Sequence, residues 1–154
     1  MPGTASAFDT LMANRRDRVA AIADRKVTTP LFHPRLDTSN WPIVVGTMDD
    51  EVDIPDFLDA VTGLHLRGPF ALVIDMRELT RLESTARHVI AAARVADAAR
   101  FPDVRRATAY ICATEAQRRA LLPLAWMSKV PYPEEQFARY DDATIWAGIV
   151  SRLQ

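Results

Sequence analysis

The sequence predicts a single α/β domain with a mixed, largely parallel sheet and helices packed on it. Short runs rich in β-branched residues alternate with amphipathic segments along most of the chain, a pattern typical of strand-helix units with parallel strands. The run FALVID at residues 70–75 is almost continuously apolar. Such a run indicates a central strand that is covered on both faces or buried deeply on one.

The composition describes a globular chain with balanced charge. Of its 154 residues, 49% are hydrophobic and 25% are charged, and the net charge is −1. This balance does not favour a nucleic-acid partner, and no apolar run approaches the roughly 20 residues of a membrane span. Cys112 is the only cysteine, which excludes an intramolecular disulfide and fits a reducing cytosol. We therefore expect a cytoplasmic protein without membrane insertion.

Two parts of the chain are predicted: a tail with an appended helix in residues 1–29, and the domain itself in residues 30–154. The appended helix covers about residues 8–26 and carries the basic run RRDR. Its apolar stripe is interrupted at Arg15. We interpret it as a helix docked on the domain with a solvated basic face. A basic amphipathic segment that binds an anionic surface or a partner is the alternative.

The domain begins with a predicted hairpin and a helix. PLFHPRLD and WPIVVGTM read as strands joined by the polar turn TSN, and Pro34 places the first strand at an edge. Asp53 is predicted to cap the following helix, in which Pro55 occupies the first turn. Gly68 and Pro69 are expected to end it.

Three further helices and two strands follow FALVID. They are a helix from the Ser84 region to Arg100, the strand ATAYICAT, a helix over residues 115–129, the short strand EQFARY and a final helix capped by Asp142. Four apolar residues of the final helix are predicted to face inward: Trp146, Ile149, Val150 and Leu153.

Three segments resemble a known family. The stretch PFALVIDMRELTRLESTARHVI resembles the central strand, loop and helix start of the SpoIIAA-like proteins, relatives of the STAS domains that include anti-sigma-factor antagonists. The tail PYPEEQFARYDDATIWAGIVSRL is similar to their closing pattern, and with WPIVVGTM the resemblance covers roughly residues 30–153. It implies a bacterial regulatory domain that acts without catalysis, through protein-protein contact.

The resemblance also implies a candidate switch. In the antagonist branch, an Asp-Ser-Ser-Gly element follows the central strand, and a partner kinase that is also the anti-sigma factor phosphorylates one serine. Its counterpart here is Glu83-Ser84-Thr85-Ala86, which keeps the acid and both hydroxyls but not the glycine. From the residues alone, Ser84 is better interpreted as a helix N-cap. Thr80 with Glu83 offers an alternative capping box that would start the helix earlier.

No metal or cofactor site is predicted. His33, His65 and His88 lack the spacings that aim two ligands at one metal, and we interpret them as surface or capping histidines. Cys112 lies late in a strand, where a small buried thiol is usual.

Asp75 ends FALVID at the carboxyl edge of the predicted sheet, where α/β proteins commonly bind ligands. We interpret it as a structural carboxylate that pairs with Arg77 or accepts hydrogen bonds from loop N–H groups. The sequence therefore predicts no enzyme activity.

The helix EAQRRALLPLAWMSK carries a wide apolar band. Three residues on one face are enough to cover the sheet: Leu121, Leu124 and Ala125. Leu122, Trp126 and Met127 lie to the side and are either buried by nearby loops or exposed. If they are exposed, they favour a protein partner or a homodimer. If they line an open cavity, they favour the alternative function, a small apolar-ligand or lipid-binding module.

Overall fold

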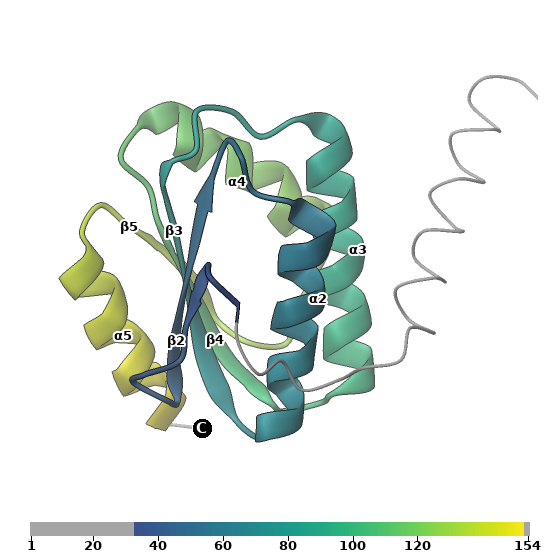
Figure 1. Cartoon of the computed structure of the whole chain (residues 1–154), viewed down its shortest axis with the longest axis vertical. Helices are drawn as coiled ribbons and strands as arrows, with labels where there is room; N and C mark the ends of the chain where they lie inside the picture. Colours follow the sequence, from purple (N-terminus) through teal and green to yellow (C-terminus); the bar gives the residue numbers. More distant parts are fainter. Residues whose placement is uncertain (1–32, 153–154) are drawn as a thin grey trace, which may run out of the picture.

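The computed structural model describes residues 33–152, which form a five-stranded sheet between two layers of helices (Figure 1). The strands are β1 (Leu36–Asp37), β2 (Ile43–Asp49), β3 (Phe70–Glu78), β4 (Arg105–Ile111) and β5 (Glu134–Phe137). The helices are α2 (Ile54–Leu64), α3 (Ser84–Arg100), α4 (Glu115–Met127) and α5 (Tyr140–Arg152), with a 3-10 turn at His65–Arg67. The helix predicted at 8–26 and the domain boundary near residue 30 lie outside the described residues.

The sheet has the order β1-β2-β3-β4-β5, and only β1 runs antiparallel to its neighbour. This confirms the predicted mixed, largely parallel α/β class. FALVID begins β3, which lies at the centre of the sheet between β2 and β4, and the strand continues through Glu78. The predicted hairpin is also confirmed, because Leu36 of β1 pairs with Gly46 of β2.

Alternation along β3 divides the core between the two faces of the sheet. Phe70 and Leu72 pack in a cluster with residues of α2, whereas Ala71 and Val73 pack in a cluster with residues of α5. On the first side, α2, α3 and α4 lie next to one another; on the second, α5 is the only helix of residues 33–152 (Figure 1). Both faces of β3 are therefore covered, as its continuous apolar sequence predicts.

The N-terminal end of α2 forms as predicted. Asp53 is its N-cap, and the carboxylate accepts a hydrogen bond from the backbone N–H of Asp56 at 3.1 Å. The 3-10 turn after α2 ends at Gly68, whose φ of +106° is a conformation that other residues rarely adopt. A glycine at this position lets the chain turn directly into β3.

The inward face of α5 differs from the prediction. The helix begins at Tyr140, so Asp142 lies in its first turn instead of capping it, and Ile149 is 52% exposed. Ala143 and Ala147 are fully buried against an alanine-rich part of the sheet, which lets the helix approach closely. Trp146 and Val150 flank this contact as predicted, and Leu153 lies outside the described residues.

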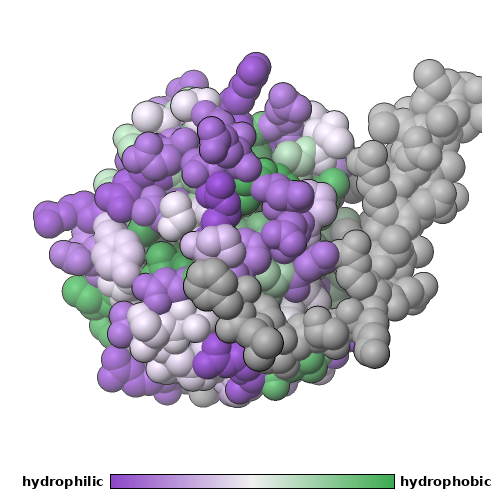
Figure 2. Space-filling view, in the orientation of Figure 1, coloured by the Kyte–Doolittle hydropathy of each residue, from purple (hydrophilic) through white to green (hydrophobic). Residues whose placement is uncertain are grey.

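Hydrophilic side chains cover most of the face shown in Figure 2. A green patch at its left edge lies over α5 (Figure 2), a helix on which Ile145 and Ile149 are exposed.

Candidate functional site

The loops that follow β2, β3 and β4 meet at one end of the molecule, and hydrogen bonds tie them together. Thr80, after β3, donates from its backbone N–H to Oδ1 of Asp50 at 2.9 Å and from its hydroxyl to Oδ2 at 2.7 Å. These two bonds, the hydroxyl contact above all, lower the pKa of Asp50. Thr80 therefore holds the loop after β2, and the predicted Thr80-Glu83 capping box is wrong.

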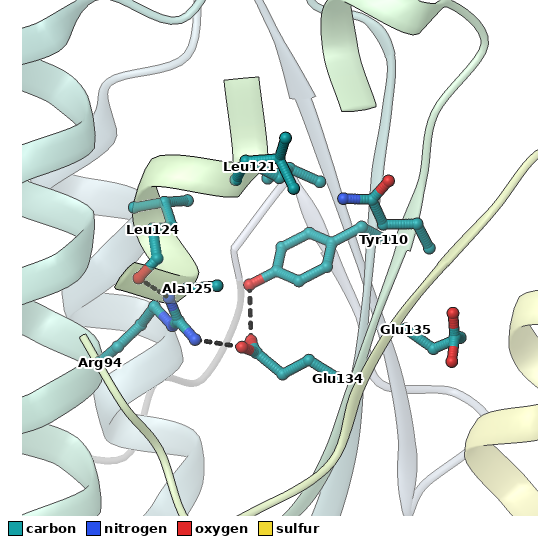
Figure 3. A pocket seen from close by; sticks show the side chains of 9 residues that line it. Arg94, Tyr110, Leu121, Leu124, Ala125, Glu134 and Glu135 are labelled. Carbon is teal, nitrogen blue, oxygen red and sulfur yellow. Dashed lines mark hydrogen bonds and ion pairs between the residues drawn. The ribbon is translucent and has the colours of Figure 1, made fainter. Parts of the chain in front are cut away.

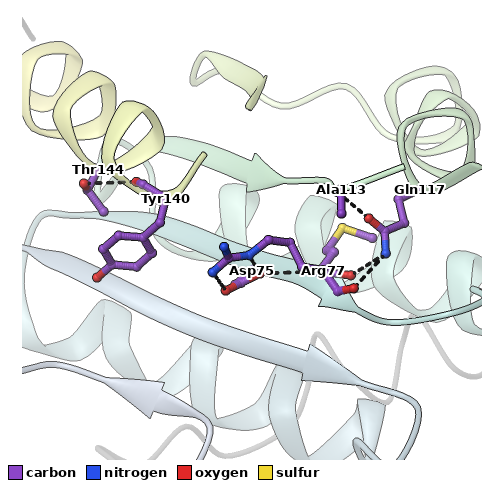
Figure 4. Close-up of polar contacts among 7 residues, drawn as sticks. Asp75, Arg77, Ala113, Gln117, Tyr140 and Thr144 are labelled. Atoms are coloured by element: carbon purple, nitrogen blue, oxygen red, sulfur yellow. Dashed lines mark hydrogen bonds and ion pairs between the residues drawn. The ribbon is translucent and has the colours of Figure 1, made fainter. Parts of the chain in front are cut away.

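Gln117 joins the loop after β3 to the loop after β4 (Figure 4). Its Nε2 donates to the carbonyl oxygens of Met76 at 2.9 Å and Leu79 at 2.8 Å, while its Oε1 accepts from the backbone N–H of Ala113 at 2.6 Å. The same side chain completes a capping box with Thr114 at the start of α4. Sequence reasoning missed Gln117, although the T-x-x-Q spacing of residues 114–117 is a recognisable signal.

α3 begins next to these joined loops, and its first two residues have exposed hydroxyl side chains. Ser84 is the first helical residue, and Thr85 is the second. The interpretation of Ser84 as N-cap is wrong, because Glu83 occupies that position with extended backbone angles, and its side chain makes no capping hydrogen bond. Leu82, two residues before the helix, is buried in the core. The result is a helix N-terminus with exposed hydroxyls and no side-chain cap, an environment that favours negative charge.

Asp75 and Arg77 lie within β3, because the strand runs beyond FALVID to Glu78, and not in a following loop. Arg77 donates to the Asp75 carboxylate from its backbone N–H, Nε and Nη2, at 3.1, 3.0 and 2.8 Å (Figure 4). Burial acts to raise the pKa of Asp75, but the bonds from Arg77 outweigh it and lower the pKa. The pairing matches the structural interpretation.

The pair lines a cleft of about 450 Å³ that also includes Arg35 and Tyr140. Arg35 is itself paired with Asp49 at 2.8 Å, so the two arginines of the cleft already have carboxylate partners.

The remaining sequence candidates are separate from one another. His33 contacts Asp56 at 2.9 Å, and Nδ1 of His88 lies 2.7 Å from the carbonyl oxygen of Ser84. His65 caps the end of α2 as expected but is buried, not on the surface. Cys112 is fully buried, and burial raises the pKa of its thiol.

Within residues 33–152, no group of three or more His, Cys, Asp or Glu side chains lies close enough to hold a metal ion. No helix in this range is long and apolar enough to cross a membrane.

The apolar band of α4 is divided between core and surface. Leu121 and Leu124 are buried as predicted, but Ala125 is exposed, because the buried stripe continues through Gln117 and Ser128 instead. Leu122 is 49% and Trp126 is 81% exposed. Met127 is half-buried and packs against the core. The open question about this band is therefore answered: Leu122 and Trp126 are exposed.

A groove of about 320 Å³ runs beside α4, between this helix and β5 (Figure 3). Its lining combines apolar side chains of α4 with polar side chains of α3, β4 and β5: Leu121, Leu122, Leu124, Ala125, Arg94, Tyr110, Glu134, Glu135 and Gln136. Trp126 is not among them.

A buried polar network forms the floor of the groove. Arg94 donates to the carbonyl oxygen of Leu124 at 3.1 Å and to the hydroxyl of Ser128 at 2.8 Å, and it forms an ion pair with Glu134 (Figure 3). Glu134 also accepts a hydrogen bond from the Tyr110 hydroxyl at 2.9 Å. No sequence signal marks this network, because its members lie up to 40 residues apart.

The fold matches a solved structure. The crystal structure of an anti-sigma factor antagonist from Mycobacterium paratuberculosis superposes with a TM-score of 0.51 at 19% sequence identity, covering 77% of this chain and 99% of that chain. This chain shares the fold of that protein. The expected SpoIIAA-like, STAS-type architecture is thus confirmed for the fold. No protein-family model and no curated protein matches the chain.

Proposed function

We propose that this chain is a regulatory domain that binds another protein at the end of the molecule where the loops after β2, β3 and β4 meet. The observation that carries the proposal is the uncapped first turn of α3, with Ser84 and Thr85 exposed. The shared fold supports it, since the neighbour is an anti-sigma factor antagonist, a protein that acts on another protein. A cytoplasmic location and the lack of a nucleic-acid partner stay predictions from the sequence.

The surface around α3 is suited to binding because it is held in place before a partner arrives. The Thr80-Asp50 bonds and the Gln117 bonds join three loops, so little conformational entropy has to be lost on association. A partner backbone carbonyl or carboxylate can accept hydrogen bonds from the free N–H groups of the first turn.

Phosphorylation of Ser84 or Thr85 is the regulatory step we propose for this surface. Both hydroxyls are exposed, so a kinase can reach them without unfolding the helix. A phosphate adds about 1.5 to 2 negative charges, which the helix dipole stabilises at this end. The modification would therefore change the charge of the binding surface and leave the fold intact. Glu83 already places a negative charge beside Ser84. Together with the phosphate it would make the surface strongly negative, so a partner that binds the unmodified hydroxyls would bind the phosphorylated form more weakly.

Affinity capture from the native cell tests the proposal with three forms of the protein. Wild type and Ser84→Asn are expected to recover the same specific partner, whereas Ser84→Asp is expected to recover much less of it. Asn and Asp have nearly the same size and both suit the first turn of a helix, so the difference reports the charge. Mass spectrometry of the native protein would identify the modified residue, and the same pair of substitutions at Thr85 tests the second hydroxyl. Absence of any specific partner, or equal recovery with all forms, would contradict the proposal.

A second candidate function is a small apolar-ligand or lipid-binding module, with the groove between α4 and β5 as its site. Its volume of about 320 Å³ is at the lower end of the range for ligand pockets. An apolar ligand would, however, cover the charged Arg94-Glu134 pair, which costs desolvation. Saturable binding of a fluorescent fatty acid that Ala125→Trp abolishes would favour this candidate over the first.

A further inference from the structure

The exposed face of α4 carries an apolar and charged stripe. Its residues are Glu115, Arg119, Leu122 and Trp126, whose spacings of four, three and four place them on one side of the helix. All four are exposed. Trp126 is 81% exposed, the largest exposed fraction among the large hydrophobic side chains of residues 33–152. Tryptophan and arginine are the residue types that most often dominate the binding energy of protein interfaces.

The helix that carries the stripe is held in place by its buried side. Leu121 and Leu124, on the opposite side of α4, are buried in the core, and Ser128 is buried just past the end of the helix. The exposed side chains are therefore presented by a helix that cannot rotate to hide them. Within residues 33–152 no other element covers Leu122 and Trp126, so burying them requires a further surface.

We infer that a second copy of this chain covers the stripe, with the two α4 helices antiparallel about a twofold axis near Leu122. In such a pair, residues equally far before and after Leu122 face one another. Glu115 is the first residue of α4 and Lys129 lies two residues past its last, so the antiparallel arrangement brings the acid at the start of one helix near the lysine that follows the end of the other. Arg119 is three residues before and Trp126 four after, so the guanidinium of one copy reaches the indole of the other.

The charge pattern is what selects a second copy as the occupant. α4 has an acid in its first turn and Lys129 just after its last, and an antiparallel pair also opposes the two helix dipoles favourably. Within one copy, Glu115 contacts Arg118 and Arg119 only at 3.5 Å, and all three side chains are exposed to solvent. Such surface pairs contribute little, so Arg119 can exchange Glu115 for Trp126 of the second copy at small cost.

The exposed pair Ile145 and Ile149 on α5 provides a matched comparison. It lies on the other face of the sheet, and Trp146, which follows Ile145, packs against the core and does not extend the exposed apolar surface. Leu122 with Trp126 offers the larger apolar surface and the cation-π contact, which is why we assign the interface to α4.

Sedimentation velocity of the full chain across a concentration series tests the inference. A contact made mainly by one helix pair is small, so the dimer is expected to dissociate on dilution. Trp126→Ala is expected to weaken association by about 30-fold or more, the effect of losing a residue that dominates an interface. Ile145→Asp, on α5, is expected to leave association unchanged, and so is Ser84→Asp, because the α4 interface is independent of the surface proposed for regulation.

A charge exchange makes the test specific for the antiparallel arrangement. Glu115→Lys places two lysines opposite each other and is expected to weaken the dimer, whereas Glu115→Lys combined with Lys129→Glu is expected to restore it. Thermal unfolding of each variant checks that the fold is kept.

Three results would overturn the inference: a wild-type protein that is monomeric throughout the series, a dimer that Ile145→Asp breaks and Trp126→Ala does not, or a double charge exchange that fails to restore association. In a monomer, shielding of Trp126 from acrylamide quenching would point to residues 1–32 as the occupant of the stripe. A freely quenched Trp126 would point to a different protein partner.

Discussion

His65 is expected to make the stability of this fold depend on pH. The side chain lies at the end of α2 and is only 4% exposed. Its ring stacks on Phe101 with centroids 5.1 Å apart and meets the edge of Phe70 at 5.0 Å. Nδ1 donates to the carbonyl oxygens of Val61 and Thr62, both at 3.1 Å. This aromatic environment accommodates a neutral imidazole far better than a charged one.

Burial, and then the nearby charge of Arg105, lowers the pKa of His65 from 6.5 to about 4. The unfolded chain takes up a proton as the pH falls below 6.5, while the folded protein does not until about pH 4. The contribution of His65 to stability is therefore fully present above pH 6.5 and is lost as the pH falls from 6.5 toward 4. A difference of about 2.5 pKa units corresponds to about 3 kcal/mol.

Urea denaturation of wild type and His65→Phe between about pH 7.5 and pH 4.5 measures this effect. Phenylalanine keeps the ring stack but cannot titrate, so its variant should lose about 2.5 kcal/mol less than wild type over that range. The variant starts from lower stability because Val61 and Thr62 lose a donor, and only the change with pH is compared. His88→Gln removes a histidine from α3 and serves as the control. Parallel loss of stability in wild type and His65→Phe would refute the reasoning.

Two further predictions concern the core. Gly46→Ala is expected to destabilise the protein by about 1–3 kcal/mol, because the added Cβ would lie 2.7 Å from Cζ of Phe57. Thermal unfolding should show that adding Phe57→Leu recovers part of this loss. No recovery would contradict the steric cause. Arg94→Met is expected to lower the free energy of unfolding, measured by urea denaturation, by about 3–5 kcal/mol, since it leaves the carboxylate of Glu134 without its cation. Adding Glu134→Gln to the same chain should restore much of that stability. A double variant as unstable as the single would contradict that account.

Several elements of the fold and of the candidate surface could be predicted from short sequence patterns. FALVID predicts a buried central strand because every position before Asp75 is apolar, and the cap at Asp53 depends on residues no more than three positions apart. T-x-x-Q at residues 114–117 belongs to the same class of signal and was available to sequence reasoning. The hydroxyl residues Ser84 and Thr85 can be located from the order of residues after the central strand, but their exposure cannot.

Long-range partners are what the sequence could not provide. Thr80 satisfies the spacing for a capping box with Glu83, yet Asp50, 30 residues away, takes both of its donors. With Thr80 held there and Leu82 buried, the helix begins at Ser84.

The sequence by itself determined the class of fold and the order of strands and helices along residues 33–152, because periodicity and helix caps are encoded within a few neighbouring positions, and it supplied the candidate residues of the proposed surface. Only the tertiary structure decided which of those residues are exposed. Whether Trp126 faces solvent, whether His65 is buried and whether Ser84 caps or follows the start of α3 depend on side chains brought together from distant parts of the chain. Burial is a property of the whole packed core, and no local pattern records it.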